Sequence, residues 1–170
     1  HFGTNDLDDI FSKLRYLIVG CDCKWVVVDH LHMLVSSVTE GDERRAIDNI
    51  MTRLRSLVEE TGAGVILVSH LRRVQGDKGH ENGVSVSLSH LRGSNAIAQL
   101  SDCVIALERD QQSEDDLESR TTRLRVLKSR YTGDVGMATA LVYDKDTGRL
   151  SEYSDYELLN SDTEDLSVPF

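Results

Sequence analysis

Apolar side chains recur at intervals of three and four residues in two parts of the chain, residues 7–18 and 47–58. This spacing places them on one face of a helix, so the pattern predicts two amphipathic helices. Thr4 or Asn5 is the expected cap of the first helix and Gly20 its end, and Gly62 and Gly64 are expected to end the second.

Three short runs without a polar residue, 25–28, 65–68 and 104–107, predict strands buried on both faces, as in a parallel sheet. The helix between the first two runs joins them into a β-α-β unit. Residues 123–128 and 137–143 alternate polar and apolar side chains, which predicts an antiparallel hairpin. The expected fold is therefore α/β: a mostly parallel sheet flanked by helices, with a C-terminal antiparallel hairpin.

The 170 residues carry 19 basic and 29 acidic side chains, a net charge of -10. Six of the acids lie in residues 152–170, which hold no Lys or Arg. We therefore expect one folded domain at residues 1–151 and an acidic, disordered tail at residues 152–170. No apolar run approaches the roughly 20 residues of a membrane span, and no signal peptide opens the chain, so a cytoplasmic protein without membrane contact is expected.

A carboxylate directly follows the first apolar run. In open α/β sheets ligands bind beyond the carboxyl ends of the strands, where Asp29 is expected. Four apolar residues followed by Asp are also the pattern of a Walker B acid, which holds nucleotide-bound Mg²⁺. His70 follows the second run and would lie beside Asp29, where it could contact a γ-phosphate or polarise water. Taken singly, Asp29 could equally be a turn residue and His70 a surface histidine.

Asp29, His30 and His32 also have the spacing of metal ligands, which leaves a metal-dependent hydrolase as a minor alternative. Lys128 and Arg130 place two cations at the turn of the predicted hairpin. A guanidinium on a rigid hairpin suits an arginine finger, although ordinary solvated charge is the alternative.

The phosphate-binding motif Gly-x-x-x-x-Gly-Lys-Ser/Thr does not occur in these 170 residues, because none of the five lysines follows a glycine. In their order along the chain, the motifs nevertheless resemble the second half of the ATPase domain of replicative ring helicases. The likeness is greatest to the bifunctional primase–helicases of short-tailed, T7-like bacteriophages, with bacterial DnaB and mitochondrial Twinkle more distant. The matching runs are 26–30, 42–44, 47–49, 68–71, 91–94, 99–102, 106–109 and 128–136.

The resemblance implies a RecA-like P-loop ATPase core that is partial here, since the family carries its P-loop and catalytic glutamate ahead of this stretch. The substrate would be ATP or dTTP with Mg²⁺ held by Asp29. His70 would contact the γ-phosphate, and Gln99, in a short helix expected at residues 94–100, would be a second sensor. The 170 residues alone are expected not to hydrolyse a nucleotide.

Further roles implied by the resemblance concern neighbouring subunits and the base. Arg130 would be the arginine finger, reaching the nucleotide of the next subunit in a ring of six or seven copies. Arg109 and Tyr143 would sandwich the base, which suits a cation and an aromatic ring.

Two segments would line the channel of the ring and bind single-stranded DNA. A basic loop at residues 72–90 would grip the DNA backbone, which explains how an acidic chain can bind DNA. The implied contacts are Arg72, Arg73, Lys78, Gly93 and Ser94.

The acidic tail ends in Phe170, and in the phage family such a tail docks onto the replicative DNA polymerase. A solubilising tail is the alternative, but a terminal aromatic ring offers an anchor that solubilisation does not need.

The expected function is therefore part of a replicative helicase that moves 5′–3′ on single-stranded DNA in the phage replisome of the host cell. A recombinase-like or circadian-clock-like ATPase without unwinding is the first alternative, and a non-catalytic module that presents the tail is the second.

Overall fold

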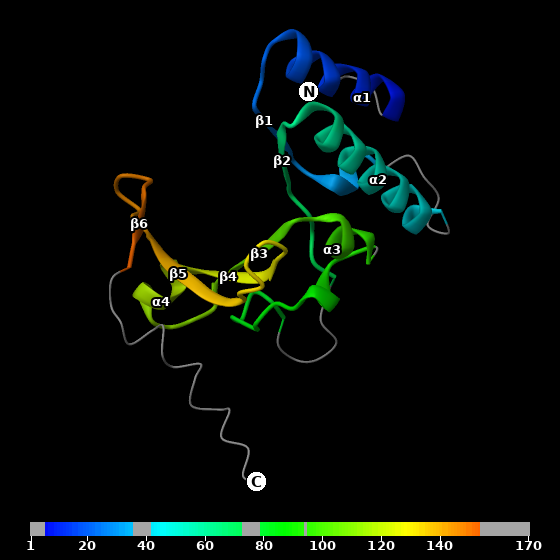
Figure 1. Cartoon of the computed structure of the whole chain (residues 1–170). Helices are drawn as coiled ribbons and strands as arrows, with labels where there is room; N and C mark the ends of the chain where they lie inside the picture. Colours follow the sequence, from blue (N-terminus) through cyan, green and yellow to red (C-terminus); the bar gives the residue numbers. More distant parts are fainter. Residues whose placement is uncertain (1–5, 36–41, 73–78, 94, 154–170) are drawn as a thin grey trace. The chain divides into compact units, whose positions relative to one another are not determined.

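The computed structural model describes residues 6–35, 42–72, 79–93 and 95–153. The chain divides into two compact units (Figure 1). The first comprises His1–Arg72 and Leu88–Ser101, and the second comprises Arg73–Ser87 and Asp102–Phe170. The domain predicted for residues 1–151 thus contains parts of both units.

In the first unit, helix α1 spans Leu7–Arg15 and continues into a π-helical turn at Tyr16–Gly20. Its cap is Asp6, whose carboxylate accepts a backbone N–H of the first turn at 2.9 Å. The prediction of Thr4 or Asn5 as the cap was wrong, because the helix begins one or two residues later than expected. A carboxylate at this position also stabilises the positive end of the helix dipole.

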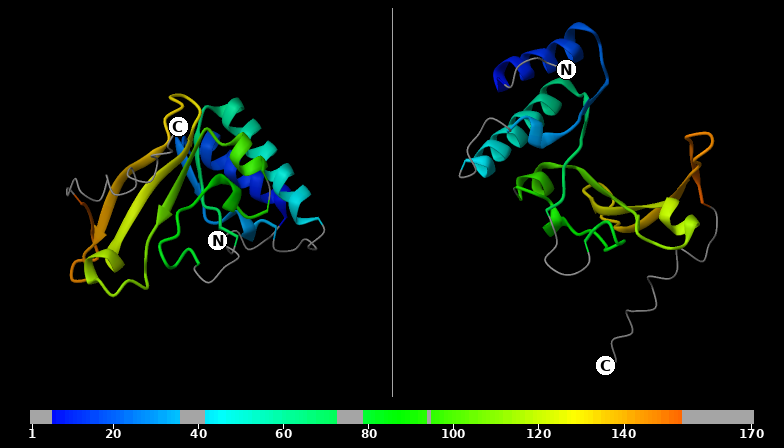
Figure 2. Two further views of the ribbon diagram at one scale, coloured as in Figure 1. Left: turned by 90° about the horizontal axis from the view of Figure 1, so that it is seen from below. Right: turned by 180° about the vertical axis from the view of Figure 1, so that it is seen from behind.

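Helix α2 spans Glu43–Thr61 and ends at Gly62, as predicted. Gly62 has a φ of +69°, a left-handed conformation that glycine adopts without steric cost. α1 and α2 lie side by side (Figure 2), and the guanidinium of Arg53 in α2 lies 4.1 Å from the ring centroid of Phe11 in α1. The short helix α3, Ala96–Leu100, is also confirmed and belongs to the same unit.

Strands β1 (Trp25–Val28) and β2 (Gly64–Leu67) pair in parallel, with Val28 opposite Leu67. This confirms the predicted β-α-β unit. The prediction that both faces are buried was wrong. Val26 is 7% exposed, whereas its neighbours Trp25 and Val27 are 69% and 64% exposed. Successive side chains of a strand point to opposite faces, so only one face of this sheet packs against the helices.

The core of the first unit is built from the buried faces of the helices and from this one face of the sheet. Loss of apolar contact with water is the dominant stabilising term for such a cluster. Its most buried members are Ile10, Leu14, Leu31, Ile47, Ile50, Leu54 and Leu57.

The second unit contains a four-stranded antiparallel sheet in the order β3-β4-β5-β6 (Figure 2). The predicted hairpin is confirmed by the pairing of β4 with β5. The antiparallel part is larger than that hairpin, because β3 pairs antiparallel with β4 and β6 with β5. The bounds are Cys103–Glu108 for β3, Thr121–Ser129 for β4, Gly136–Tyr143 for β5 and Leu150–Glu152 for β6, with helix α4 at Asp116–Arg120.

The α/β class is confirmed, with parallel and antiparallel pairing both present. Within the described ranges, no helix has the length and apolar character needed to cross a bilayer.

Candidate functional site

The carboxyl ends of β1 and β2 form one edge in the first unit. Two backbone hydrogen bonds extend the pairing beyond the strands: Val68 N–H donates to the Val28 carbonyl, and Leu31 N–H donates to the Val68 carbonyl, each at 2.9 Å. Asp29 and His70 therefore leave the sheet at the same edge, as expected from the sequence. Asp29 is exposed there, and its peptide bond to His30 is cis.

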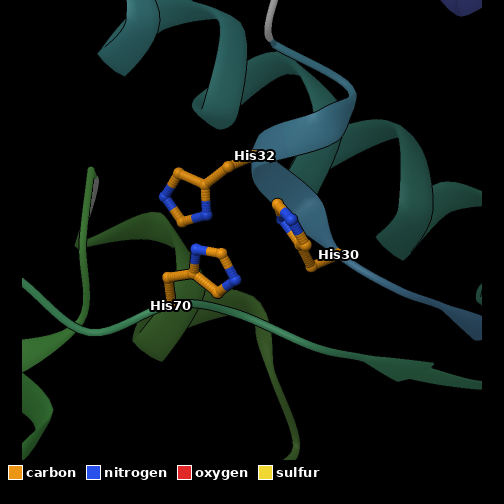
Figure 3. Close-up of side chains that lie close together, drawn as sticks. All are labelled: His30, His32 and His70. Atoms are coloured by element: carbon orange, nitrogen blue, oxygen red, sulfur yellow. The ribbon is translucent and has the colours of Figure 1, made fainter.

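Three histidines gather at this edge (Figure 3). His30 follows Asp29, His32 lies in the short 3-10 turn Leu31–Met33, and His70 lies three residues after the end of β2. The ring centroids of His30 and His70 are 3.9 Å apart, those of His32 and His70 5.4 Å, and those of His30 and His32 6.1 Å. The sequence pattern singled out His30 and His32, but it did not join them to His70, which the parallel register brings beside them.

His32 is the most buried of the three, at 9% exposed. Burial lowers the pKa of its imidazole, and the nearby positive charge of Arg92 adds to this effect. Smaller influences of the Arg92 backbone and the Glu43 carboxylate act in the opposite direction. His32 is therefore favoured in its neutral form, in which a ring nitrogen can accept a hydrogen bond or bind a cation.

Residues 91–93, here called the returning segment, lie against the histidines. Arg92 N–H donates to the His70 carbonyl at 3.2 Å, and the Arg92 guanidinium lies 3.7 Å from Glu43. Gly93 has a φ of +104°, and a Cβ there would lie 2.2 Å from Ile47 Cδ1 and 3.9 Å from His32 Nε2. Only glycine allows the backbone to pass this close to the core and to His32.

The same segment closes the base of the loop predicted to bind DNA. Leu71 and Leu91 form an antiparallel bridge, and Arg72 N–H donates to the His90 carbonyl at 2.9 Å. His70 is thus the residue directly before the closed base of the loop. Of the predicted DNA contacts, Arg72 and Gly93 are exposed, whereas Arg73, Lys78 and Ser94 lie outside the described residues. Gln99 is exposed on α3.

Arg130, the candidate arginine finger, follows β4 in the second unit. Its backbone N–H donates to the Asp102 carbonyl at 2.8 Å, and its guanidinium lies 3.2 Å from the Asp102 carboxylate. Its side chain is 40% exposed, so the guanidinium is held at the surface and is not packed into the core. Asp102 lies in a matching run, but no role was expected for it, and it meets Arg130 only because β3 and β4 pair antiparallel.

Arg109 and Tyr143 lie at one end of the four-stranded sheet. β3 and β5 both pair antiparallel with β4 and so run in the same direction, and Arg109 directly follows β3 while Tyr143 ends β5. Arg109 Nε donates to the Ser119 carbonyl at 2.7 Å. Tyr143 is 37% exposed, which leaves part of its ring available for stacking. Phe170 lies outside the described residues.

The β-α-β unit with polar groups at its carboxyl edge defines an α/β protein, and two solved structures share its fold. One is described as a DnaB-like replicative helicase and its interactions with primase. It has a TM-score of 0.66 and 24% identity, and the match covers 84% of this chain and 34% of that one. The other is a KaiC-like protein from the archaeon Pyrococcus horikoshii OT3, with a TM-score of 0.58, 13% identity, and 87% and 57% covered.

Residues 3–152 match the DnaB-like helicase C terminal domain, and the chain therefore belongs to this family. A DNA helicase/primase of Enterobacteria phage T3 is 40% identical over 153 residues, which are 90% of this chain and 26% of that protein. The chain thus spans about a quarter of the length of this relative. The alternative of a recombinase-like or clock-like ATPase gains no support, because the KaiC-like protein shares the fold alone.

Proposed function

We propose that these residues form the C-terminal part of the motor domain of a replicative DNA helicase. The longer protein hydrolyses ATP or dTTP at subunit interfaces of a hexameric or heptameric ring and moves 5′–3′ on single-stranded DNA to unwind duplex. The observation that carries the proposal is the shared edge of β1 and β2, where Asp29 and His70 emerge beside the closed base of the 72–90 loop.

The residues at this edge fit a nucleotide with Mg²⁺. Mg²⁺ is bound through oxygen, usually by one or two carboxylates together with phosphates and water. The exposed carboxylate of Asp29 is such a ligand, whereas the neighbouring imidazoles are not. Bound Mg²⁺ would neutralise charge on the phosphates. The P-loop and the general base are supplied by residues outside these 170, so this stretch alone does not turn over nucleotide.

His70 reports the state of the nucleotide to the DNA loop. Its side chain is exposed at the edge, where it would contact the γ-phosphate, and its backbone carbonyl accepts a hydrogen bond from Arg92 N–H in the returning segment. A shift of His70 is passed through the Leu71–Leu91 bridge to both ends of the loop. The loop and its neighbour bind the DNA backbone through Arg72, Arg73, Lys78, Gly93 and Ser94, and Gln99 acts as a second sensor.

Arg130 completes the site of the neighbouring subunit. The ion pair with Asp102 keeps the guanidinium extended at the surface, which limits the side-chain freedom lost when it meets a phosphate. Arg109 and Tyr143 hold the base of the nucleotide in their own subunit, at the shared end of β3 and β5.

The experiment that tests this function replaces Arg130 by Ala in the longer protein and measures nucleotide hydrolysis with single-stranded DNA. An arginine finger contributes about a thousandfold or more to turnover, so hydrolysis falls by that order while nucleotide binding is kept. Arg149→Ala, an exposed arginine of the same unit without an assigned role, is the control. Retained hydrolysis in the Arg130 variant contradicts the proposal.

The tail carries a second, separate role as the contact to the replicative DNA polymerase. Its acids suit a basic patch, and Phe170 suits an apolar pocket within that patch. Deletion of Phe170 should weaken polymerase binding in a pull-down or in calorimetry, whereas Ser167→Ala should not. Unchanged binding after the deletion assigns the tail to solubility instead.

A further inference from the structure

The three histidines at the β1–β2 edge are arranged as ligands of one metal ion. One ring nitrogen from each of His30, His32 and His70 lies within 4.8 Å of the other two (Figure 3). A transition-metal–imidazole bond is about 2.0–2.1 Å long, which places the nitrogens of a tetrahedral site about 3.3 Å apart. The nitrogens must therefore approach one another by up to about 1.5 Å for all three to bind one ion.

Some ring nitrogens of this cluster lack a hydrogen-bond partner among the described residues. Nδ1 and Nε2 of His32 and Nδ1 of His30 are buried, and within the described part of the chain they have no hydrogen-bond partner. A buried polar atom without a partner is destabilising, and a water molecule or a bound ion is one means of satisfying it. A metal ion at the centre of the cluster supplies a partner for one nitrogen of each ring.

The donor set selects the kind of metal. Three imidazoles and no carboxylate disfavour Mg²⁺ and Ca²⁺, which prefer oxygen, and favour Zn²⁺, Co²⁺, Ni²⁺ or Cu²⁺. His70 is exposed, whereas His32 is buried, so one side of the cluster faces solvent and the other side faces protein. Three protein ligands with one open position match the coordination of accessible zinc sites.

We propose that His30, His32 and His70 form a binding site for a divalent transition metal, with Zn²⁺ as the expected ion and an open fourth position toward solvent. The site is distinct from the Mg²⁺ that Asp29 is proposed to hold. A metal ion on His70 would also withdraw that side chain from the γ-phosphate and so inhibit hydrolysis. This last consequence rests on the proposed function, whereas metal binding itself does not.

Titration of the whole 170-residue chain with Co²⁺ tests the site without reference to catalysis. Co²⁺ bound by three imidazoles in a four- or five-coordinate site gives strong visible d–d absorption, which the hydrated ion lacks. We expect this absorption to saturate at one ion per chain and to disappear when Zn²⁺ displaces Co²⁺. A spectrum that stays that of hydrated Co²⁺ overturns the proposal.

Three histidine variants assign the ligands. Loss of a ligand should weaken metal affinity at least as much as loss of an outer hydrogen-bond partner does, about tenfold or more, so His32→Ala and His70→Ala should both show this loss. His90→Ala, in the same unit but outside the cluster, should leave the affinity unchanged. His32 is buried, so His32→Ala could lower stability as well as metal affinity. His70 is exposed, so His70→Ala decides the test: an unchanged metal affinity in this variant overturns the proposal.

Cysteine is the competing ligand and needs its own variant. Cys21 is exposed and Cys23 is half-buried, and thiolates also bind Zn²⁺. The double variant Cys21→Ser/Cys23→Ser should keep the Co²⁺ spectrum and the affinity of the original chain. Loss of binding in this variant, with binding retained in His70→Ala, assigns the metal to the thiols and rejects the histidine site.

Discussion

Arg130 is bonded to Asp102 twice, through its backbone N–H to the Asp102 carbonyl at 2.8 Å and through its guanidinium to the carboxylate at 3.2 Å. The backbone bond fixes where the turn after β4 begins, and the ion pair fixes the direction of the side chain. Asp102 is therefore a positioning residue for the proposed arginine finger.

Replacement of Asp102 by Ala in the longer protein should lower DNA-stimulated hydrolysis far less than Arg130→Ala does. The backbone bond remains, and a half-exposed ion pair contributes only about 1 kcal/mol or less, which corresponds to a few-fold in rate. Steady-state hydrolysis at saturating nucleotide measures the effect, with Asp116→Ala as a surface ion-pair control. A loss as large as that of Arg130→Ala would assign Asp102 a direct part in the reaction.

Glu108 is the buried carboxylate of the second unit. Its side chain is 4% exposed and accepts Arg125 Nε at 3.1 Å and the Val86 N–H at 2.7 Å. Glu108→Ala should cost about 3–5 kcal/mol, because it removes the buried carboxylate to which Arg125 Nε and the Val86 N–H both donate. Urea unfolding measures the loss, and the exposed pair of Lys145 is the comparison: Lys145→Ala should cost about 1 kcal/mol or less. Equal costs would show that burial does not govern this pair.

Gly93 tests how tightly the returning segment approaches the core. Gly93→Ala places a Cβ 2.2 Å from Ile47 Cδ1 at a φ of +104°, so a loss of about 1–3 kcal/mol is expected from strain and overlap. The additional variant Ile47→Val removes the overlapping methyl group and should recover part of that loss. Gly133→Ala is the matched control, since that glycine also has positive φ but open space around it. If both variants lost the same stability, backbone strain alone would account for the loss, and the overlap with Ile47 would be rejected as a cause.

The turn after β5 gives a pH prediction. Backbone N–H groups of Thr147 and Asp146 donate to Asp144 at 3.0 and 2.8 Å and hold the pKa of its carboxyl below the ordinary value of 3.8. A carboxyl with a lowered folded-state pKa contributes stability above its ordinary pKa and loses it as the pH falls through the lowered value. Asp144→Ala should therefore reduce the acid dependence of unfolding below about pH 4. The free energy of unfolding measured against pH checks this. The same loss of stability at acid pH in Asp144→Ala and in the unmodified chain would contradict the contribution of Asp144.

The β-α-β unit could be predicted because its signals are local. The apolar runs at 25–28 and 65–68 and the helical spacing at 47–58 are each sufficient without knowledge of the rest. The exposure of one sheet face could not be predicted, since Trp25 and Val27 are as apolar as the buried Val26 and only packing distinguishes them. The antiparallel pairing of β3 with β4 was also missed, because strand pairing depends on contacts between distant parts of the chain.

The candidate site was predictable in part. The positions of Asp29 and His70 at one edge follow from parallel pairing alone. The contact of His70 with His32 depends in addition on the 3-10 turn after β1, and Gly93 approaches His32 only because its φ is positive. Neither conformation has a strong local sequence signal.

The central claim is that His70 couples the nucleotide to DNA, and the variant His70→Ala in the longer protein tests it most directly. The decisive measurement is the stimulation of hydrolysis by single-stranded DNA, taken without transition metals and with nucleotide binding measured in parallel. We predict that nucleotide binding persists while stimulation falls by about a hundredfold, the order expected for loss of one charge-stabilising donor. Stimulation equal to that of the unmodified protein would contradict the claim.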